Sequence, residues 1–335
     1  MLVMIKMDEM IKGDQLVIDI MKSWFMQEPT RIEPLNGQSP NYGWKVSYGN
    51  KIYVLRQCVR NNELPWLQYL EVLTNELIQR GYPIQRIIAS LSGKQTIQKY
   101  GHFWQLRQFV EGRLHQMGCD TDEQEVIRNM IQLHSMKKLP QGPKNPNCQL
   151  YNWIYQSERC LKETEDALMY CTNNKRRQQL LTVYEKELQI ALETLTPEIY
   201  EQLPVSLTHG DFHANNLLYN ETNLIMVLDF DTVDFRPRVY DVAVAAYLLT
   251  RVKRGSFELD MKRTVKFIKN YSLQCKLSEQ EIRSMTPLIQ LLYLPTARYL
   301  NMLRKESPHL LDWYLDWSLD ALVSVRKQLK VDWFL

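Results

Sequence analysis

The sequence predicts an α+β protein in two parts, a small β-rich N-terminal part and a larger, mostly helical C-terminal part. The first third alternates short β-like runs with turns, whereas helical periodicity dominates from about residue 120 onward, apart from a strand-rich island near residues 205–230. A chain of 335 residues also exceeds the length at which a single core usually stops growing. We therefore expect one unit over residues 1–111 and a second over residues 112–335.

The first elements form a predicted hairpin followed by a helix. A strand at Trp44–Tyr48 leads through a Gly-Asn turn into a strand at Lys51–Arg56. Leucines then recur at helical spacing over Pro65–Arg80, and Gly81 is suited to end that helix.

A second hairpin is expected further along the N-terminal part. Its strands would be Ile87–Leu91 and Thr96–Tyr100, joined by a Ser-Gly-Lys turn, with a further strand at His102–Val110.

Two capping boxes mark helix starts in the C-terminal part. Thr121 with Gln124 predicts a helix that ends near Ser135, and Ser278 with Glu281 predicts another.

Composition excludes several classes of protein. The chain is 45% hydrophobic and 24% charged with a net charge of +3, which is typical of a globular protein. Its Lys and Arg residues are spread along the sequence, so we expect no nucleic-acid partner. The six cysteines form no C-x-x-C pair and are interpreted as free thiols.

Membrane insertion and secretion are not expected either. No apolar run reaches the roughly 18 residues of a membrane span, and charges at Lys6, Asp8 and Glu9 interrupt the apolar start. A reducing cytoplasm is the simplest location.

The strongest chemical signal is the run from Leu207 to Tyr219. It contains His209, Asp211 and Asn216 in the pattern H-x-D-x-x-x-x-N, and Asp229 follows thirteen residues after the asparagine. Transfer of a γ-phosphoryl group needs a carboxylate beside the attacking hydroxyl and oxygen ligands that hold Mg²⁺ against the phosphates.

Asp211 fits the first requirement, and a hairpin turned near residues 220–223 would bring Asn216 and Asp229 to one metal ion. The alternative is that these polar residues only cap turns, as Asp and Asn often do. The strand before the pattern, the hairpin after it and the second acidic residue occur in the order that phosphoryl transfer requires, which favours the chemical interpretation.

These residues resemble the catalytic loop and metal-binding segment of the aminoglycoside phosphotransferase and choline kinase superfamily. The resemblance extends over most of the chain and implies a two-lobed, protein-kinase-like fold, ATP and Mg²⁺ as cofactors, and a small-molecule hydroxyl as acceptor. It implies that Asp211 is the catalytic base or hydroxyl-orienting residue, that His209 braces the loop, and that Asn216 and Asp229 bind Mg²⁺.

The resemblance continues, more weakly, in the N-terminal part. Val54-Leu55-Arg56 resembles the family strand whose cation contacts the α- and β-phosphates, although protein kinases use Lys there. Its partner carboxylate would be Glu71 or Glu76, of which we favour Glu71. An exposed strand arginine and solvated helix carboxylates are the alternatives.

Two further segments occupy positions that the family uses for nucleotide contacts. Leu35–Gly43 stands where a phosphate-covering turn would be but lacks a G-x-G-x-x-G pattern. Gln108–Arg113 resembles the lobe-connecting hinge, where the carbonyl of Gln108 and the N–H of Val110 would meet adenine.

Downstream, Asp241 is expected to hold the catalytic loop by hydrogen bonds, and Asp231 is either a further metal neighbour or a capping carboxylate. His213 and His134 are interpreted as structural histidines.

The acceptor site is ambiguous. Asp312, Asp316 and Asp320 share one face of a predicted helix beside Trp313 and Trp317, which suits a cationic acceptor such as an amino sugar or a quaternary amine. An amphipathic helix with a solvated acidic side explains the same pattern.

Other functions stay open. Glu63–Trp66 and the hinge are also similar to homoserine-kinase-like and spore-coat-associated members of the superfamily, so a homoserine-like acceptor or a structural, kinase-like scaffold is possible. A protein kinase is disfavoured, since no activation segment or A-P-E element follows Asp229. We expect the protein to be a monomer or a homodimer.

Overall fold

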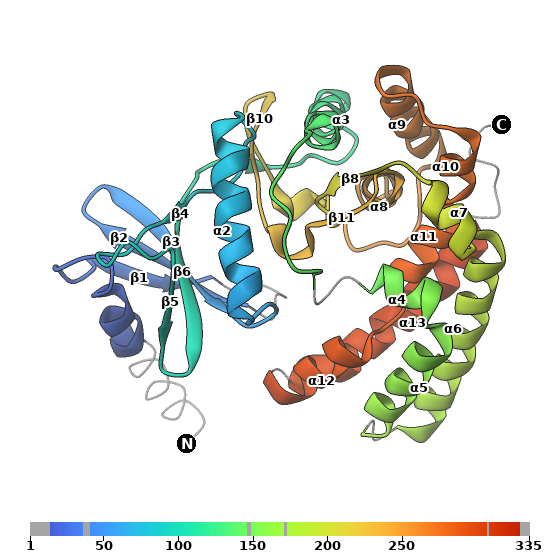
Figure 1. Ribbon diagram of the computed structural model, residues 1–335, viewed down its shortest axis with the longest axis horizontal. Coiled ribbons are helices and arrows are strands. Elements are labelled where there is room, and N and C mark those ends of the chain that lie inside the picture. Colours follow the sequence, from blue (N-terminus) through green and yellow to red (C-terminus); the bar gives the residue numbers. More distant parts are fainter. Residues whose placement is uncertain (1–13, 36–40, 146–148, 171–172, 307, 329–335) are drawn as a thin grey trace. The chain divides into compact units, whose positions relative to one another are not determined.

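The computed structural model describes residues 14–35, 41–145, 149–170, 173–306 and 308–328. The chain divides into two compact units. The N-terminal unit comprises Met1–Glu111 together with Leu139–Pro143, and the C-terminal unit comprises Gly112–Lys138 together with Lys144–Leu335. The mixed α/β fold is as expected, with a β-rich first unit and a largely helical second one (Figure 1).

An antiparallel sheet forms the centre of the N-terminal unit. Its strands follow the order β1-β2-β3-β6-β4, and β5 also pairs with β6. The strand bounds are β1 Arg31–Pro34, β2 Tyr42–Tyr48, β3 Lys51–Cys58, β4 Ile87–Ile88, β5 Thr96–Lys99 and β6 His102–Gln108.

The first predicted hairpin is confirmed by the pairing of β2 with β3. The second was wrong in its partners, because β4 and β5 both pair with β6 and not with each other. The short turn that closes a hairpin is instead the one between β5 and β6, where Tyr100 and Gly101 both have positive φ.

The two faces of this sheet differ in character. Alternate strand residues such as Leu55, Trp104 and Leu106 form an apolar core with Val17 and Ile20 of a helical segment at residues 14–21. The opposite face carries polar side chains and meets α2 (Leu64–Gln79), which lies beside the sheet (Figure 1).

The segment Leu139–Pro143 returns to the N-terminal unit from the C-terminal one, which the sequence did not indicate. A Cβ on Gly142 would lie only 2.2 Å from the Tyr69 ring of α2, so the glycine is in close contact with that ring. Leu139, in the same returning segment, is buried.

The C-terminal unit combines two small β elements with many helices. One is a sheet of order β10-β9-β7 and the other a ribbon of β8 and β11. The bounds are β7 Arg113–Leu114, β8 Val205–Thr208, β9 Leu217–Asn220, β10 Asn223–Val227, β11 Asp234–Pro237, α3 Asp120–Ser135, α4 Leu150–Tyr155, α5 Ser157–Leu168, α6 Asn174–Thr194, α7 Pro197–Gln202, α8 Val239–Leu249, α9 Met261–Gln274, α10 Glu279–Arg283, α11 Met285–Leu292, α12 Ala297–Glu306 and α13 Leu311–Gln328.

One predicted capping box is confirmed and one is wrong. Ser278 and Glu281 exchange both hydrogen bonds of the motif at the start of α10. Helix α3 begins one residue before Thr121, with Cys119 at the N-cap and no side-chain cap, so Thr121 does not cap it.

Helix α8 is apolar on nearly every side and almost wholly buried, as its sequence requires of a helix inside a core.

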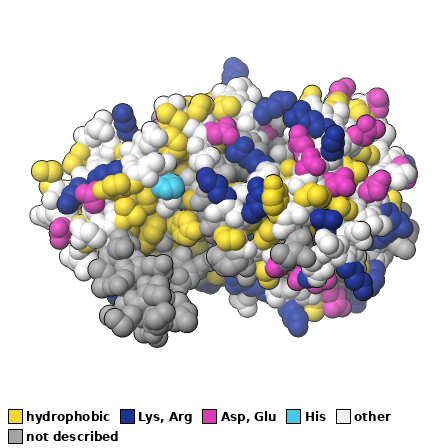
Figure 2. Space-filling model, turned by 90° about the horizontal axis from the view of Figure 1, so that it is seen from below, with side chains coloured by type: hydrophobic (Ala, Val, Ile, Leu, Met, Phe, Trp, Pro, Cys, Tyr) yellow, Lys and Arg dark blue, Asp and Glu magenta, His cyan; other side chains and the backbone are white. Residues whose placement is uncertain are grey.

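None of the described helices is both long and apolar enough to cross a membrane. On the face drawn in Figure 2, Lys and Arg side chains are scattered among side chains of other kinds.

Candidate functional site

The predicted catalytic loop lies in the C-terminal unit, between β8 and β9. It leaves the β8–β11 ribbon after Thr208, passes through a short 3₁₀ turn at Ala214–Asn216 and enters the β9–β10 hairpin. The hairpin that the sequence predicted is confirmed, and it is turned between Asn220 and Asn223.

A fully buried carboxylate, Asp241 of α8, holds this loop. Its two oxygens accept hydrogen bonds from the backbone N–H groups of His209 at 2.7 Å and Gly210 at 2.6 Å, as expected from the sequence. His134 of α3 lies 3.1 Å from the same carboxylate and is oriented by the Tyr271 hydroxyl at 2.8 Å.

The charge of Asp241 is stabilised by what surrounds it. Burial alone would raise the pKa of this carboxyl, but the contacts with His134 and the positive charge of Arg236 outweigh burial and lower it. Asp241 is therefore ionised, and it fixes two consecutive amides of the loop in place.

His209 connects the loop to the end of the hairpin. Its Nδ1 accepts the Asp211 N–H at 3.2 Å, so the proton is on Nε2, which donates to the Leu228 carbonyl at 2.8 Å. Burial lowers the pKa of His209, which keeps the ring neutral in this tautomer. These contacts are those of a residue that positions the loop.

Gly210 is required at its position. Its φ is +82°, and a Cβ there would lie 1.9 Å from the guanidinium of Arg236 and 2.9 Å from the Thr232 carbonyl. Arg236 itself donates to Thr208 Oγ1 at 2.6 Å. The loop is thus fixed on both sides.

The structure brings Asp211, Asn216 and Asp229 to one end of the hairpin. Asn216 Nδ2 donates to the Asp211 carbonyl at 3.0 Å and lies 3.4 Å from its carboxylate. The Leu228 N–H donates to the Asn216 carbonyl at 2.8 Å, which places Asp229, one residue further on, beside Asn216. Asp229 lies just after β10 in the left-handed region, with φ of 60°, a conformation that Asp tolerates better than most residues.

The donor set fits a magnesium ion that also binds phosphates. Because Asn216 uses its Nδ2 within the loop, its Oδ1 is oriented away and available, and Asp229 supplies a carboxylate. The described residues contain no cluster of three or more His, Cys, Asp or Glu side chains placed to hold a metal. Mg²⁺ at this site would therefore complete its coordination with phosphates and water.

His213, interpreted as structural from the sequence, lies beside the carboxylate of Asp211. Its Nε2 is 3.5 Å from Asp211 Oδ2, and its Nδ1 accepts the Asn215 N–H at 3.1 Å. Burial opposes its protonation, yet the nearby carboxylates outweigh burial and raise its pKa. Asp231, by contrast, is buried and its carbonyl accepts from Asn145.

In the N-terminal unit, Arg56 lies on the polar face of the sheet. Its cross-strand neighbours are Gly43 and Gln105, and Gln105 in turn pairs with Thr96 and donates to its hydroxyl at 3.0 Å. Cross-strand neighbours share a face, so Arg56 and Thr96 belong to the same polar surface.

Glu71 of α2 reaches this surface through Thr96. Burial raises its pKa, and hydrogen bonds from Thr96 oppose that rise. Glu76 pairs with Arg80 at 2.6 Å, within α2.

Sequence reasoning missed Arg107, a buried arginine on the same polar face. It donates to Gln105 Oε1 at 2.8 Å. The sequence contained a signal for this position. Gln105 and Arg107 alternate with the apolar Trp104 and Leu106, and this period of two places Gln105 and Arg107 together on the face opposite the apolar core.

The two predicted hinge residues lie at and just beyond the end of β6. The Gln108 carbonyl already accepts from Gln85 Nε2 at 2.7 Å, although a carbonyl has a second lone pair. Among the described residues, the Val110 amide has no hydrogen-bond acceptor. Of the predicted phosphate-covering turn, residues 36–40 lie outside the described residues, and its ends meet through Leu35 N–H to Gly43 O at 2.8 Å.

The acidic row on α13 does not act as one surface. Asp316 pairs with Arg176 of α6, while Asp312 and Asp320 are exposed. Trp317 packs into an aromatic cluster with Phe257 and Tyr293.

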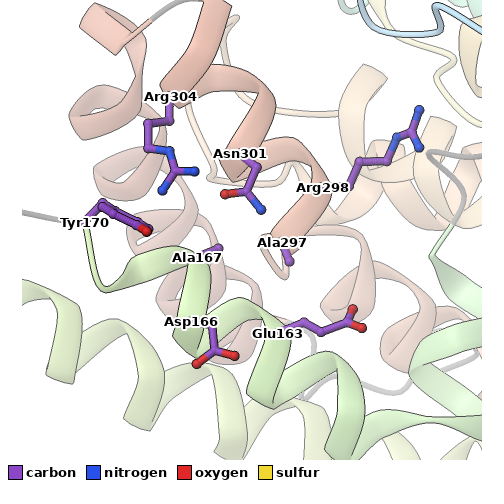
Figure 3. Close-up of a pocket in the computed structure, with 8 residues that line it drawn as sticks. All are labelled: Glu163, Asp166, Ala167, Tyr170, Ala297, Arg298, Asn301 and Arg304. Atoms are coloured by element: carbon purple, nitrogen blue, oxygen red, sulfur yellow. The ribbon is translucent and has the colours of Figure 1, made fainter.

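A hollow of about 490 Å³ lies between α5 and α12 (Figure 3). All of its lining residues are exposed or half-buried, and Arg304 stacks on the Tyr170 ring at 3.9 Å. None of them belongs to the predicted catalytic loop, so this hollow is not assigned to the predicted site.

Comparison with known proteins agrees with the fold. The sequence matches the APH phosphotransferase enzyme family over residues 31–267, and the chain belongs to this family. No sequence among the curated proteins matches it.

Several solved kinase structures share the fold at low sequence identity. A microcompartment-associated aminopropanol kinase is 14% identical with a TM-score of 0.69, covering 96% of this chain and 99% of that one. Spectinomycin phosphotransferase with bound ADP and spectinomycin is 11% identical, with a TM-score of 0.60 and coverage of 95% and 98%. The Plasmodium vivax ethanolamine kinase is 15% identical, with a TM-score of 0.59 and coverage of 89% and 82%.

Proposed function

We propose that this protein is an ATP-dependent phosphotransferase that transfers the γ-phosphoryl group to a hydroxyl of a small molecule in the cytoplasm. The observation that carries the proposal is the assembly of Asp211, Asn216 and Asp229 at one end of the hairpin, on a loop fixed by Asp241. A degenerate scaffold would have no need to keep all three groups.

In the proposed reaction, Asp211 accepts a hydrogen bond from the acceptor hydroxyl and orients its oxygen toward the γ-phosphorus. The new O–P bond forms as the bond between the γ-phosphorus and the β–γ bridging oxygen breaks, so that the electron pair leaves with ADP and the hydroxyl proton passes to Asp211 or to water. Mg²⁺ held by Asn216 and Asp229 would neutralise charge on the phosphates.

The acceptor classes that this proposal covers are amino sugars, amino alcohols and homoserine-like compounds. Family membership and the names of the structural neighbours support small-molecule kinases as a group. A phosphate-transfer screen over these classes, with release of ADP as the readout, would separate an enzyme from the alternative, a kinase-like scaffold with a binding role.

Binding of Mg²⁺-nucleotide is the first expected result. ATP with Mg²⁺ at about a hundred times its dissociation constant should raise the free energy of unfolding by about 2.7 kcal/mol and the melting temperature by several degrees. Asp229→Asn should lose most of this increase, because the metal ligand is weakened. A wild-type melting temperature that does not change when ATP or GTP is added together with Mg²⁺ would overturn the proposal.

Arg56 is proposed to bind the nucleotide phosphates. A hydrogen bond to a charged group contributes about 1.5–3 kcal/mol, so Arg56→Ala should raise the KM for ATP about tenfold or more and change the acceptor's KM little. Lys51→Ala is the matched control, because Lys51 is an exposed cation on the same strand. An Arg56→Ala enzyme with an unchanged KM for ATP would place the phosphate contact elsewhere.

A further inference from the structure

Arg251 is a buried cation just beyond the C-terminal end of α8. Only 7% of the residue is exposed. Its guanidinium lies over the rings of Tyr247 at 4.6 Å and Phe257 at 5.2 Å, and its Nη2 donates to the Tyr293 hydroxyl at 2.5 Å. Its Nε is buried and has no hydrogen-bond acceptor among the described residues.

No negative charge in the described part of the chain pairs with Arg251. The ion pairs formed there by half-buried arginines, such as Arg238 with Glu281 and Arg263 with Glu123, have no counterpart at this position. The neighbouring phenols do not supply the charge either. Burial raises the pKa of Tyr247 to about 12 and also raises the pKa of Tyr293, so both phenols stay neutral.

A buried guanidinium without a carboxylate is unusual, because burial of a charge is costly unless the charge is paired. The two aromatic faces offset part of that cost. They leave the Nε–H unused, and an arginine presents its N–H groups in a planar fork that matches carboxylate and phosphate oxygens. The geometry is that of a preformed anion-binding group.

This group lies on the catalytic side of the unit. Tyr293 accepts the hydrogen bond from Arg251. Burial is the largest cause of its raised pKa, and the Asp211 carboxylate also contributes, so the two residues are close enough to interact electrostatically. In the same way the charge of Arg254 acts on His213, the neighbour of Asp211.

The loop that carries Arg251 is short, closed and basic. Its ends are joined by hydrogen bonds from Val252 N to Glu258 O and from Asp260 N to Thr250 O, both at 2.9 Å. Between them it presents Arg251, Lys253 and Arg254 against a single acidic residue, Glu258.

An aromatic surface continues from this loop onto α13. The ring of Trp317 lies 5.8 Å from Phe257 and 5.1 Å from Tyr293, and Trp313 stacks on it at 6.2 Å with 42% of its surface exposed. The apolar part of a small acceptor can pack on such rings.

We propose that the hydroxyl acceptor carries an anionic group, a carboxylate or a phosphate, which Arg251 binds while the acceptor's apolar part contacts the Trp317 and Phe257 rings. This inference rests on the proposed phosphotransferase function and specifies its substrate class. It differs from the cationic acceptor that the acidic row on α13 suggested, since Asp316 there is paired with Arg176.

The test uses paired hydroxy compounds that differ in their anionic group. L-Homoserine is compared with 3-aminopropan-1-ol, glycerate with glycerol, and glycerol 3-phosphate with glycerol. Melting temperatures are measured for the full chain with saturating AMP-PNP and Mg²⁺, so that the nucleotide's own phosphates are already bound, and again without nucleotide. AMP-PNP alone reports nucleotide binding, and its failure would overturn the proposed function separately.

We expect at least one anionic member to stabilise the wild type more than its neutral or cationic partner in the presence of AMP-PNP. Arg251→Met should weaken that binding tenfold to hundredfold and leave the AMP-PNP shift unchanged. Arg283→Met is the matched control, because Arg283 is an exposed arginine paired with Glu279 on α10.

Three results obtained with AMP-PNP present would overturn the inference. They are stabilisation only by the neutral or cationic members, no response to any anionic member while AMP-PNP still binds, and an anionic preference that survives Arg251→Met. A preference for anions seen only without AMP-PNP would assign Arg251 to the nucleotide phosphates and would equally contradict it. If Arg251→Met does not fold, Arg251→Lys, which keeps the charge but not the fork, should show the same loss of preference.

Discussion

Replacement of Asp211 by Asn should abolish most phosphoryl transfer while the protein folds normally and still binds nucleotide. The substitution keeps the size of the side chain and removes the charge that orients the attacking hydroxyl. Positioned acid–base groups contribute about 10² to 10⁴ in rate, and a fall in kcat of that size is expected in a single-turnover assay with the true acceptor.

Comparison with Asp229→Asn separates two roles at this site. Loss of a metal ligand should weaken Mg²⁺-nucleotide binding as well as turnover, whereas Asp211→Asn should leave nucleotide binding intact. If Asp211→Asn stayed within a few-fold of the wild type, the assignment of the catalytic loop would be wrong.

Replacement of Asp241 by Ala should cause the largest loss of stability. The change leaves the N–H groups of His209 and Gly210 and the ring of His134 without their buried acceptor. Removal of one partner from a buried charged pair costs about 3–5 kcal/mol, a large part of the roughly 5–15 kcal/mol that typically stabilises a domain. Denaturant unfolding would measure the loss. Asp320→Ala, at an exposed carboxylate on α13, should change stability by no more than about 0.5 kcal/mol.

The stabilising contribution of Asp241 should also depend on pH in a defined direction. Burial alone would raise its folded-state pKa, but His134 and Arg236 outweigh burial and hold it below the ordinary value of 3.8. Its contribution is therefore fully present above the unfolded-state pKa and is lost as the pH falls through the lower folded-state pKa. The stability difference between wild type and Asp241→Asn should stay level above about pH 5 and shrink below about pH 4. A difference that grew on acidification would contradict this account.

Much of the fold and of the candidate site could be predicted because the evidence is local in sequence. His209, Asp211 and Asn216 lie within eight residues of one another, and the alternating apolar strands on either side of them specify the hairpin. Asp229 follows at the distance that one hairpin allows.

What could not be predicted depends on contacts between distant residues. The partners of β4 and β5 are decided by β6, because a short strand pairs with whichever neighbour buries its apolar side. The pairing of Glu71 with Thr96 and the burial of Arg251 against Tyr293 likewise join residues far apart in the chain. A charged residue on a helix or in a loop carries no local signal of such a partner.

The return of Leu139–Pro143 to the N-terminal unit has a consequence for the way the protein can be divided. The chain passes from one unit to the other at residue 111, at residue 138 and again at residue 143, so a single cut cannot release either unit intact. A fragment that ended at Glu111 would leave the Tyr69 ring without the glycine that lies against it. During synthesis on the ribosome, the first unit would likewise stay incomplete until about thirty more residues had emerged, which makes its final folding step dependent on chain that belongs mostly to the second unit.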